Sequence, residues 1–253
     1  MASYQVPIEN KLPMPHQEPP RKRIKSPKDI AERLLFLIIA IVLIYVPQVP
    51  MSVVLVLKKR GTPASMPLYI ALFALMIALY IGAVWLMRFL IHRYTDHPLV
   101  RRWEKRDALY VVLGYLAMFG AKLILLPFYT SISGEQLTKN DAVIRGMLKD
   151  GNQIIFMIVF MTVIAAPILE EMVFRGYVMT AFYTRNPIWP ILISGVLFGL
   201  VHQNNNIAGT LIYVALGAIL AYVYRRTGNI TVNIGLHFLN NAPMIFMALQ
   251  FIK

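Results

Sequence analysis

Two adjacent acidic residues, Glu170 and Glu171, lie in the middle of a strongly apolar run, and they are the only acidic residues from position 151 to the end. A carboxylate inside hydrocarbon is costly, so acidic residues in such a run are candidates for a functional site. On a helix, Arg175 shares a face with Glu171 and can form an ion pair with it, which could simply support helix packing. Glu170 points about 100° away and has no partner on its own helix.

Two later apolar segments each carry a histidine. His202 is the only ionisable residue of the segment 188–202 and follows Phe198 by four residues. His237 and Asn241 are also four residues apart, so they share a helix face. An imidazole and an amide directed at one point could donate hydrogen bonds to an oxyanion, whose charge develops only in the transition state. Their simpler role would be a polar contact between helices.

These segments belong to a series of apolar runs that we interpret as membrane-spanning helices. Of the 253 residues, 58% are hydrophobic and 15% are charged, whereas soluble domains carry about 25% charged residues. A helix needs about 20 apolar residues to cross a bilayer. The sequence therefore predicts an all-α, polytopic membrane protein of about seven transmembrane helices. The predicted spans are 34–57, 67–91, 109–128, 154–183, 188–202, 208–224 and 230–252.

The four candidate residues are predicted to lie at a similar depth in the membrane. At a rise of about 1.5 Å per residue from the cytosolic end of each helix, Glu170 lies about 20 Å deep and His202 about 21 Å deep. On the last helix, His237 lies about 12 Å deep and Asn241 about 18 Å deep. Pro167 would kink the helix beside Glu170 and free the carbonyl of residue 163. A polar cluster near mid-membrane is the expected result.

The chain divides into three predicted regions. Residues 1–33 are polar, basic and rich in proline, and we expect a disordered cytosolic tail on anionic lipid headgroups. Residues 34–150 would form the first transmembrane helices, and 151–253 the core with the polar cluster. The net charge of +13 comes mainly from Lys and Arg in the tail and between apolar runs. This distribution indicates a cytosolic N-terminus in the cell membrane rather than binding to nucleic acid. Lys122 would extend toward the membrane surface.

Three motifs in these residues resemble those of the CAAX prenyl protease and bacteriocin-processing family of intramembrane proteases. Residues 170–175 match its EExxxR motif, residues 198–202 its FxxxH motif, and residues 237–241 its HxxxN motif. The motifs occur in the family's order, each inside a predicted span, and cover about the last 100 residues. The spans before them carry no family signature.

The resemblance implies an intramembrane endopeptidase that hydrolyses peptide bonds of membrane-associated peptides or proteins. Glu170 and His202 would activate water, while His237 and Asn241 would stabilise the oxyanion. Glu171, Arg175 and Phe198 would support the site. An alternative is a membrane protein of the same fold that binds without turnover, such as a bacteriocin self-immunity protein. A transporter would instead distribute its charges along a path.

The sequence leaves open whether the chemistry needs a metal. The chain lacks HExxH, the helical spacing that arranges two histidines around zinc. Glu170, His202 and His237 could still supply three zinc ligands. Asn241 favours the metal-free alternative, because an amide suits an oxyanion hole better than a metal shell. The expectation is therefore a glutamate-type protease without a cofactor, with zinc as the alternative.

Overall fold

The computed structural model describes residues 26–96, 98–182 and 188–252, and within them all regular structure is helical. The all-α prediction is confirmed. The first half contains α1 (Pro27–Tyr45), the 3₁₀ turn η1 (Val46–Gln48), α2 (Val49–Lys59), α3 (Met66–His92), α4 (Lys105–Ser133) and α5 (Lys139–Leu148). The second half contains α6 (Asn152–Val159), the π-helix η2 (Phe160–Ala165), α7 (Ala166–Glu171), the π-helix η3 (Met172–Val178), α8 (Met179–Ala181), α9 (Ile188–Val201), α10 (Ile207–Thr227), α11 (Ile230–Asn241) and α12 (Pro243–Leu249).

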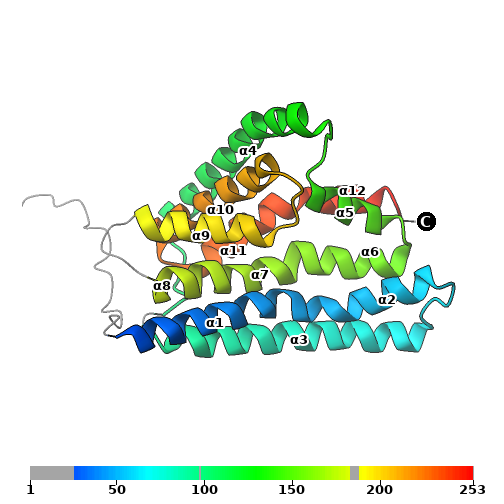
Figure 1. Ribbon diagram of the computed structural model, residues 1–253, viewed down its shortest axis with the longest axis horizontal. Coiled ribbons are helices and arrows are strands. Elements are labelled where there is room, and N and C mark those ends of the chain that lie inside the picture. The colour runs from blue at the N-terminus through cyan, green and yellow to red at the C-terminus, as the bar shows by residue number, and fades with distance from the viewer. Residues whose placement is uncertain (1–25, 97, 183–187, 253) are drawn as a thin grey trace, which may run out of the picture.

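Six helical segments of the described residues are long and apolar enough to cross a membrane. They correspond to six of the seven predicted spans, and the end of the fourth span at Tyr183 lies outside the described residues. The fifth predicted span forms α9, which has only 14 residues. At about 1.5 Å per residue, α9 is about 21 Å long and shorter than the ~30 Å hydrocarbon core. Figure 1 shows α9 ending partway along the bundle, and this brings its C-terminal end to the interior depth where His202 follows.

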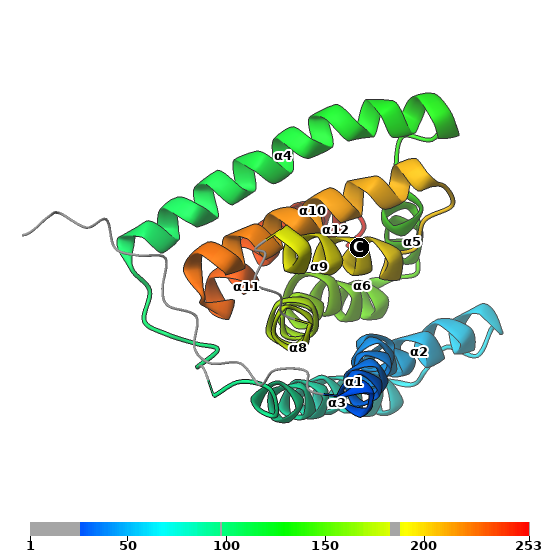
Figure 2. The ribbon, with the colours of Figure 1, turned by 60° about the vertical axis from the view of Figure 1, so that its left-hand side comes forward.

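The helices form successive layers around one long central segment. The segment from α6 to α8 lies between α1–α3 on one side and α9–α11 on the other (Figures 1 and 2). Helix α4 crosses the outside of α10 and α11. The two predicted transmembrane regions therefore pack together, because α4 from the first region contacts two helices of the second.

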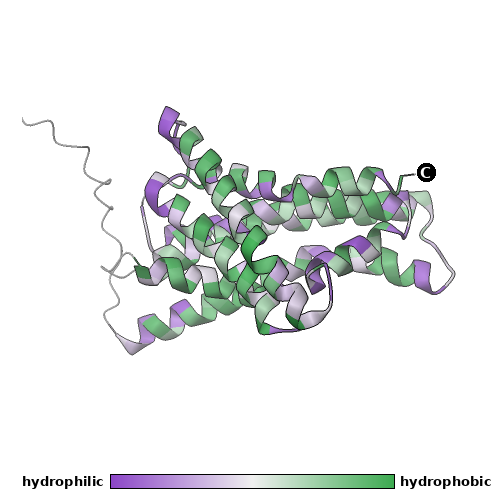
Figure 3. Ribbon diagram, turned by 90° about the horizontal axis from the view of Figure 1, so that it is seen from above, coloured by the Kyte–Doolittle hydropathy of each residue, from purple (hydrophilic) through white to green (hydrophobic). Residues whose placement is uncertain are grey.

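The outer surface of the bundle is apolar. Figure 3 shows hydrophobic residues along the helices and hydrophilic residues gathered mainly at helix ends and loops. Large side chains such as Trp85 (70% exposed) and Ile124 (74% exposed) point outward from α3 and α4. An exposed apolar band of this size is expected when lipid, not water, surrounds a helical bundle.

The predicted tail of residues 1–33 needs a correction at its end, because α1 begins at Pro27 rather than at residue 34. Ser26 caps this helix through a capping box, which the sequence pattern contains. Arg33 is buried, and its guanidinium donates a hydrogen bond to the backbone carbonyl of the last residue of α8. Packing against the bundle thus orders a segment whose polar composition suggested disorder. Residues 1–25 lie outside the described residues.

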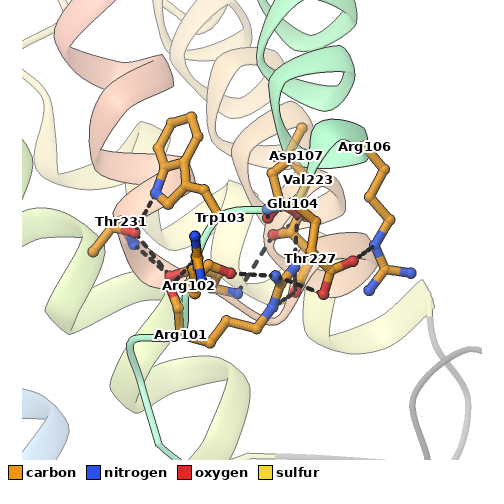
Figure 4. Close-up of polar contacts among 10 residues, drawn as sticks. Arg101, Arg102, Trp103, Glu104, Arg106, Asp107, Val223, Thr227 and Thr231 are labelled. Atoms are coloured by element: carbon orange, nitrogen blue, oxygen red, sulfur yellow. Dashed lines mark hydrogen bonds and ion pairs between the residues drawn. The ribbon is translucent and has the colours of Figure 1, made fainter.

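The turn between α10 and α11 is anchored to the segment that precedes α4 (Figure 4). The guanidinium of Arg101 donates to Asp107 at 2.7 Å and to the backbone carbonyl of Thr227 at 2.8 Å. The indole of Trp103 donates to Thr231 Oγ1 at 2.8 Å. Asp107 is fully buried, so its ion pair with Arg101 is largely shielded from solvent, whereas Trp103 lies at the surface. It fixes the start of α11, the helix that carries two of the candidate residues.

Close helix packing fixes α9 against α10. A Cβ atom on Gly199 would lie 2.9 Å from the backbone nitrogen of Val214, and one on Gly217 would lie 2.7 Å from Cβ of Phe198. Gly195 is four residues before Gly199 and faces the same helix. Small residues at this spacing let two membrane helices approach closely. This contact sets the position of the α9 end, where His202 follows.

Candidate active site

The central helical segment changes its hydrogen-bond register beside the glutamate pair. In η2, the backbone N–H of Ala166 donates to the carbonyl of Met161, five residues back. The next donor in this register would be Pro167, which has no N–H, so the carbonyl of Thr162 is left free. The α-helical register assumed from the sequence placed the free carbonyl at Val163 instead. Short π-helical stretches within α-helices are frequent at functional sites.

Glu171 is fully buried and contacts three polar side chains. Arg175 Nη1 lies 3.2 Å from Oε1, and this is the ion pair that the sequence predicted. Asn233 Nδ2 donates to Oε2 at 3.2 Å, and His237 Nδ1 lies 2.9 Å from Oε1. Arg175 Nη2 also donates to the carbonyl of Gly217 at 2.7 Å. The buried carboxylate and guanidinium thus pair with each other and tie α10 and α11 to the central helix, while Arg175 Nε has no hydrogen-bond partner among the described residues.

Glu170 has a different environment. Its side chain is 12% exposed, and its Oε2 atom is buried without a hydrogen-bond partner among the described residues. The nearest described basic atom is His237 Nε2, at 3.9 Å from Oε2. Because His237 Nδ1 faces the carboxylate of Glu171, that nitrogen carries a proton, and Nε2 faces Glu170. A gap of 3.9 Å is too long for a direct hydrogen bond and suits a shared water or substrate oxygen.

His202 is the first residue after α9 and is half-buried. Its Nδ1 donates to the carbonyl of Phe198 at 2.7 Å, so Nε2 is the nitrogen that can accept a proton. Its ring stacks on Tyr213, with centroids 4.3 Å apart and planes at 14°. Tyr213 is held in turn by α5, since its hydroxyl lies 2.9 Å from Thr138 Oγ1 and 3.2 Å from Asp141 Oδ1.

Phe198 packs against both histidines. Its ring centroid is 4.5 Å from that of His202 and 5.7 Å from that of His237. It also lies beneath the guanidinium of Arg175, at 4.9 Å. A single aromatic ring therefore contacts the guanidinium of Arg175 and both imidazoles, and it limits how the two imidazoles can turn.

The four predicted catalytic residues line one cavity of about 500 Å³. These residues are Glu170, His202, His237 and Asn241. The wall also includes residues of α1, α4, α5, α10 and α12. Helix α5, which the sequence analysis left between two spans, contributes Asn140 and Asp141 to this wall, and its N-cap residue Thr138 also lines the cavity. A cavity of this size can hold several peptide groups away from the lipid.

The arrangement does not fit the zinc site that the sequence left open. In the part of the chain that the structure describes, no three His, Asp or Glu side chains are grouped so as to hold a metal ion. A structural or catalytic zinc needs three or four such ligands at about 2.0–2.3 Å. Glu170, His202 and His237 share the cavity without converging on one point in this way.

Three polar residues that sequence reasoning missed are Asn233 and Asn240 of α11 and Lys122 of α4. Asn233 could have been found, because it precedes His237 and Asn241 at intervals of four in the sequence. Lys122 of α4 was expected to extend to the membrane surface, but its Nζ donates to Asn240 Oδ1 at 2.7 Å and lines the cavity. No local pattern predicted that contact, because it joins residues far apart in the chain.

Residues 152–243 match the family model described as Type II CAAX prenyl endopeptidase Rce1-like. The matched segment runs from α6 to the start of α12 and contains all seven of the predicted site residues. The resemblance to this family is confirmed. No solved structure matches the chain.

Three bacterial relatives also match. The chain is 35% identical over 99 residues to "Putative membrane peptidase YdiL" of Bacillus subtilis, covering 39% of this chain and 40% of the relative. It is 35% identical over 80 residues to "Uncharacterized protein YyaK" of the same organism, covering 28% and 27%. It is 24% identical over 162 residues to "UPF0177 protein YvdC" of Lactococcus lactis, covering 64% and 60%. The chain thus matches about two fifths of the length of YdiL.

Proposed function

We propose that this protein is an intramembrane endopeptidase that hydrolyses peptide bonds of membrane-associated peptides or proteins. The observation that carries the proposal is the environment of Glu170. Its carboxylate oxygen is buried, has no hydrogen-bond partner among the described residues, and faces His237 Nε2 across 3.9 Å inside a cavity of about 500 Å³. Leaving a polar atom unsatisfied in a membrane protein is costly, so such an atom is expected to contact a substrate or water.

The proposed reaction uses the two sides of the cavity. Glu170 and His202 bind one water and take a proton from it as its oxygen attacks the peptide carbonyl carbon. His237, with a proton on each ring nitrogen, donates from Nε2 to the oxyanion that forms on the carbonyl oxygen, and the amide of Asn241 donates to the same oxygen. The C–N bond then breaks, and the proton taken from water passes to the leaving amine. His202 suits this transfer because its Nδ1 is held by Phe198 and its Nε2 is free to gain and lose a proton.

Glu171 and Arg175 would act through His237. The carboxylate of Glu171 fixes the ring orientation by accepting from Nδ1, and Arg175 and Asn233 hold the carboxylate in place. A carboxylate that orients a histidine is a frequent arrangement at catalytic sites. Glu170 would thus take part in the reaction, while Glu171 would orient His237.

A comparison of membrane peptides tests the proposal. Cells producing the wild-type protein or the Glu170→Gln variant would be compared by mass spectrometry of their membrane peptides. New peptide termini that depend on Glu170 are expected. Glu135→Gln is the matched control, because Glu135 is exposed in the loop after α4. If both variants give the wild-type pattern, Glu170 does not act in cleavage.

The same experiment separates the alternative, a membrane protein of this fold that binds without turnover. Such a protein would confer its phenotype, for instance protection from a bacteriocin, without generating new peptide termini. Persistence of the phenotype in Glu170→Gln, together with an unchanged peptide pattern, would favour binding over catalysis.

A further inference from the structure

Lys122 carries a positive charge inside the bundle, and its contact is unusual. A lysine within a transmembrane helix normally faces the bundle interior only when it pairs with another group. Here its Nζ donates to the side-chain amide of Asn240 at 2.7 Å, and both residues line the cavity that contains Asn241. The ammonium therefore contacts Asn240, the residue immediately before the proposed oxyanion donor Asn241.

The contact continues as a chain of hydrogen bonds across three helical elements. Asn240 Nδ2 donates to Asn241 Oδ1 at 2.9 Å. Asn241 Nδ2 then donates to the backbone carbonyl of Thr162 at 2.8 Å. This carbonyl is available because η2 shifts the register by one residue and Pro167 supplies no N–H. The chain thus runs from α4 through the end of α11 to η2.

The two ends of this chain impose the same direction on it. An ammonium group can only donate, and a carbonyl can only accept. Asn240 must therefore turn its oxygen to Lys122 and its nitrogen to Asn241. Asn241 must turn its oxygen to Asn240 and its nitrogen to Thr162. A side-chain amide would otherwise choose between two orientations of similar shape.

We propose that Lys122 and Asn240 are positioning residues that fix the amide of Asn241 with its nitrogen toward the active-site cavity. The proposal rests on the proposed function, in which Asn241 donates to the oxyanion. One N–H of the amide is used by Thr162, and the second is then available to the substrate. With the amide reversed, Asn241 would present an oxygen to a developing negative charge.

The test is a series of substitutions at Lys122, assayed on a quenched peptide carrying a cleavage sequence identified from the membrane-peptide comparison. Lys122→Met should lower kcat by about 10- to 100-fold, part of the effect of losing an oxyanion donor, with KM changed less than about twofold. Lys122→Glu, which can only accept, should lower kcat further. Lys122→Arg should retain most of the activity, because it still donates. Lys139→Met, on the exposed start of α5, is the matched control.

Two outcomes would overturn the positioning role. If Lys122→Met and Lys122→Glu keep the wild-type kcat, Lys122 is not needed to orient the side-chain amide of Asn241. A change confined to KM would indicate that the ammonium binds substrate instead. A third outcome would also overturn the positioning role. If kcat falls equally in the Met, Glu and Arg variants and in proportion to their melting temperatures, Lys122 only supports the fold.

A second measurement does not depend on cleavage. The effects of Lys122→Met and Asn241→Leu on unfolding in detergent should be non-additive, because both break the same hydrogen-bonded chain. Lys139→Met combined with Asn241→Leu should be additive. Coupling without any cleavage by the wild type would reject the proposed function and retain the hydrogen-bonded chain. Cleavage with additive effects at Lys122 and Asn241 would reject the positioning role alone.

Discussion

His237 Nδ1 lies 2.9 Å from Oε1 of Glu171, the second glutamate of the pair. The first glutamate, Glu170, faces the opposite side of the same imidazole at 3.9 Å. One ring therefore separates a carboxylate that is saturated with hydrogen bonds from one that has an unsatisfied oxygen. Two adjacent residues of the same type thus have different physical environments, and substitutions should affect them in opposite ways.

Removing Glu171 should destabilise the fold. Glu171→Ala leaves Arg175 buried without its carboxylate, and breaking a buried pair in this way costs about 3–5 kcal/mol. The expected result is a large fall in melting temperature in detergent. The protein that stays folded should also lose activity, because the ring of His237 loses the carboxylate that orients it. Thermal unfolding of purified protein would measure it.

The matched control for this prediction is the double variant Glu171→Ala with Arg175→Met. Removing both charges should recover part of the stability, because no uncompensated guanidinium remains. If the single and double variants unfold at the same temperature, the buried pair is not the source of the effect. Glu170→Gln should leave the melting temperature unchanged or raise it, since it removes an unpaired carboxylate.

The contact between Glu171 and Arg175 could be predicted from the sequence because it is local. Residues four apart on a helix are neighbours whatever the tertiary fold. Helix rise and the spacing of apolar runs also predicted that His202 and His237 could meet, and both line the same cavity. Only one feature of the sequence distinguished the two glutamates. Glu171 has Arg175 on the same helix face, whereas Glu170 has no partner on its own helix.

Other features depend on contacts that no local pattern encodes. The π-helical register in η2 moves the free carbonyl from Val163 to Thr162, and a one-residue shift cannot be read from Pro167 alone. Lys122 turns inward because Asn240 lies opposite it on another helix. Composition likewise suggested disorder up to residue 33, whereas the burial of Arg33 depends on α8.

The stacking of His202 on Tyr213 of α10 gives a prediction about that tyrosine. Tyr213→Leu should lower kcat by about tenfold or more, because it frees the ring of a proposed general base, whose contribution is typically 10²–10⁴-fold. Tyr213→Phe keeps the ring but loses the contacts to Thr138 and Asp141, so a smaller effect is expected. Steady-state kinetics of both variants would measure this, with melting temperatures as a check on folding. A larger loss in the Phe variant than in the Leu variant would contradict the role of stacking.

The orientation in the membrane can be tested directly because the chain has no cysteine. We predict a cytosolic N-terminus, because basic residues gather at the end of the bundle where α1 begins and α10 ends (Figure 1). Arg93 contacts Glu32 of α1, Arg101 contacts Thr227 at the end of α10, and Arg226 is in the last turn of α10. Val100→Cys, before α4, should then be protected from an impermeant maleimide in intact cells. Glu135→Cys, after α4, should react. The reverse labelling pattern would invert the topology.

The last prediction concerns metal dependence. Because the described His, Asp and Glu side chains form no group of three around one point, we expect cleavage to proceed without a bound metal. The two roles that zinc would supply, activation of water and stabilisation of the oxyanion, are assigned instead to Glu170 with His202 and to His237 with Asn241. Purified protein should therefore keep its activity after dialysis against a chelator, and elemental analysis should find zinc well below one per chain. His202→Ala offers a second readout, since a zinc ligand would change the zinc content when removed, whereas a general base would change kcat alone. Stoichiometric zinc whose removal stops cleavage and whose return restores it would require the cavity to rearrange around the metal, and would reject the glutamate mechanism.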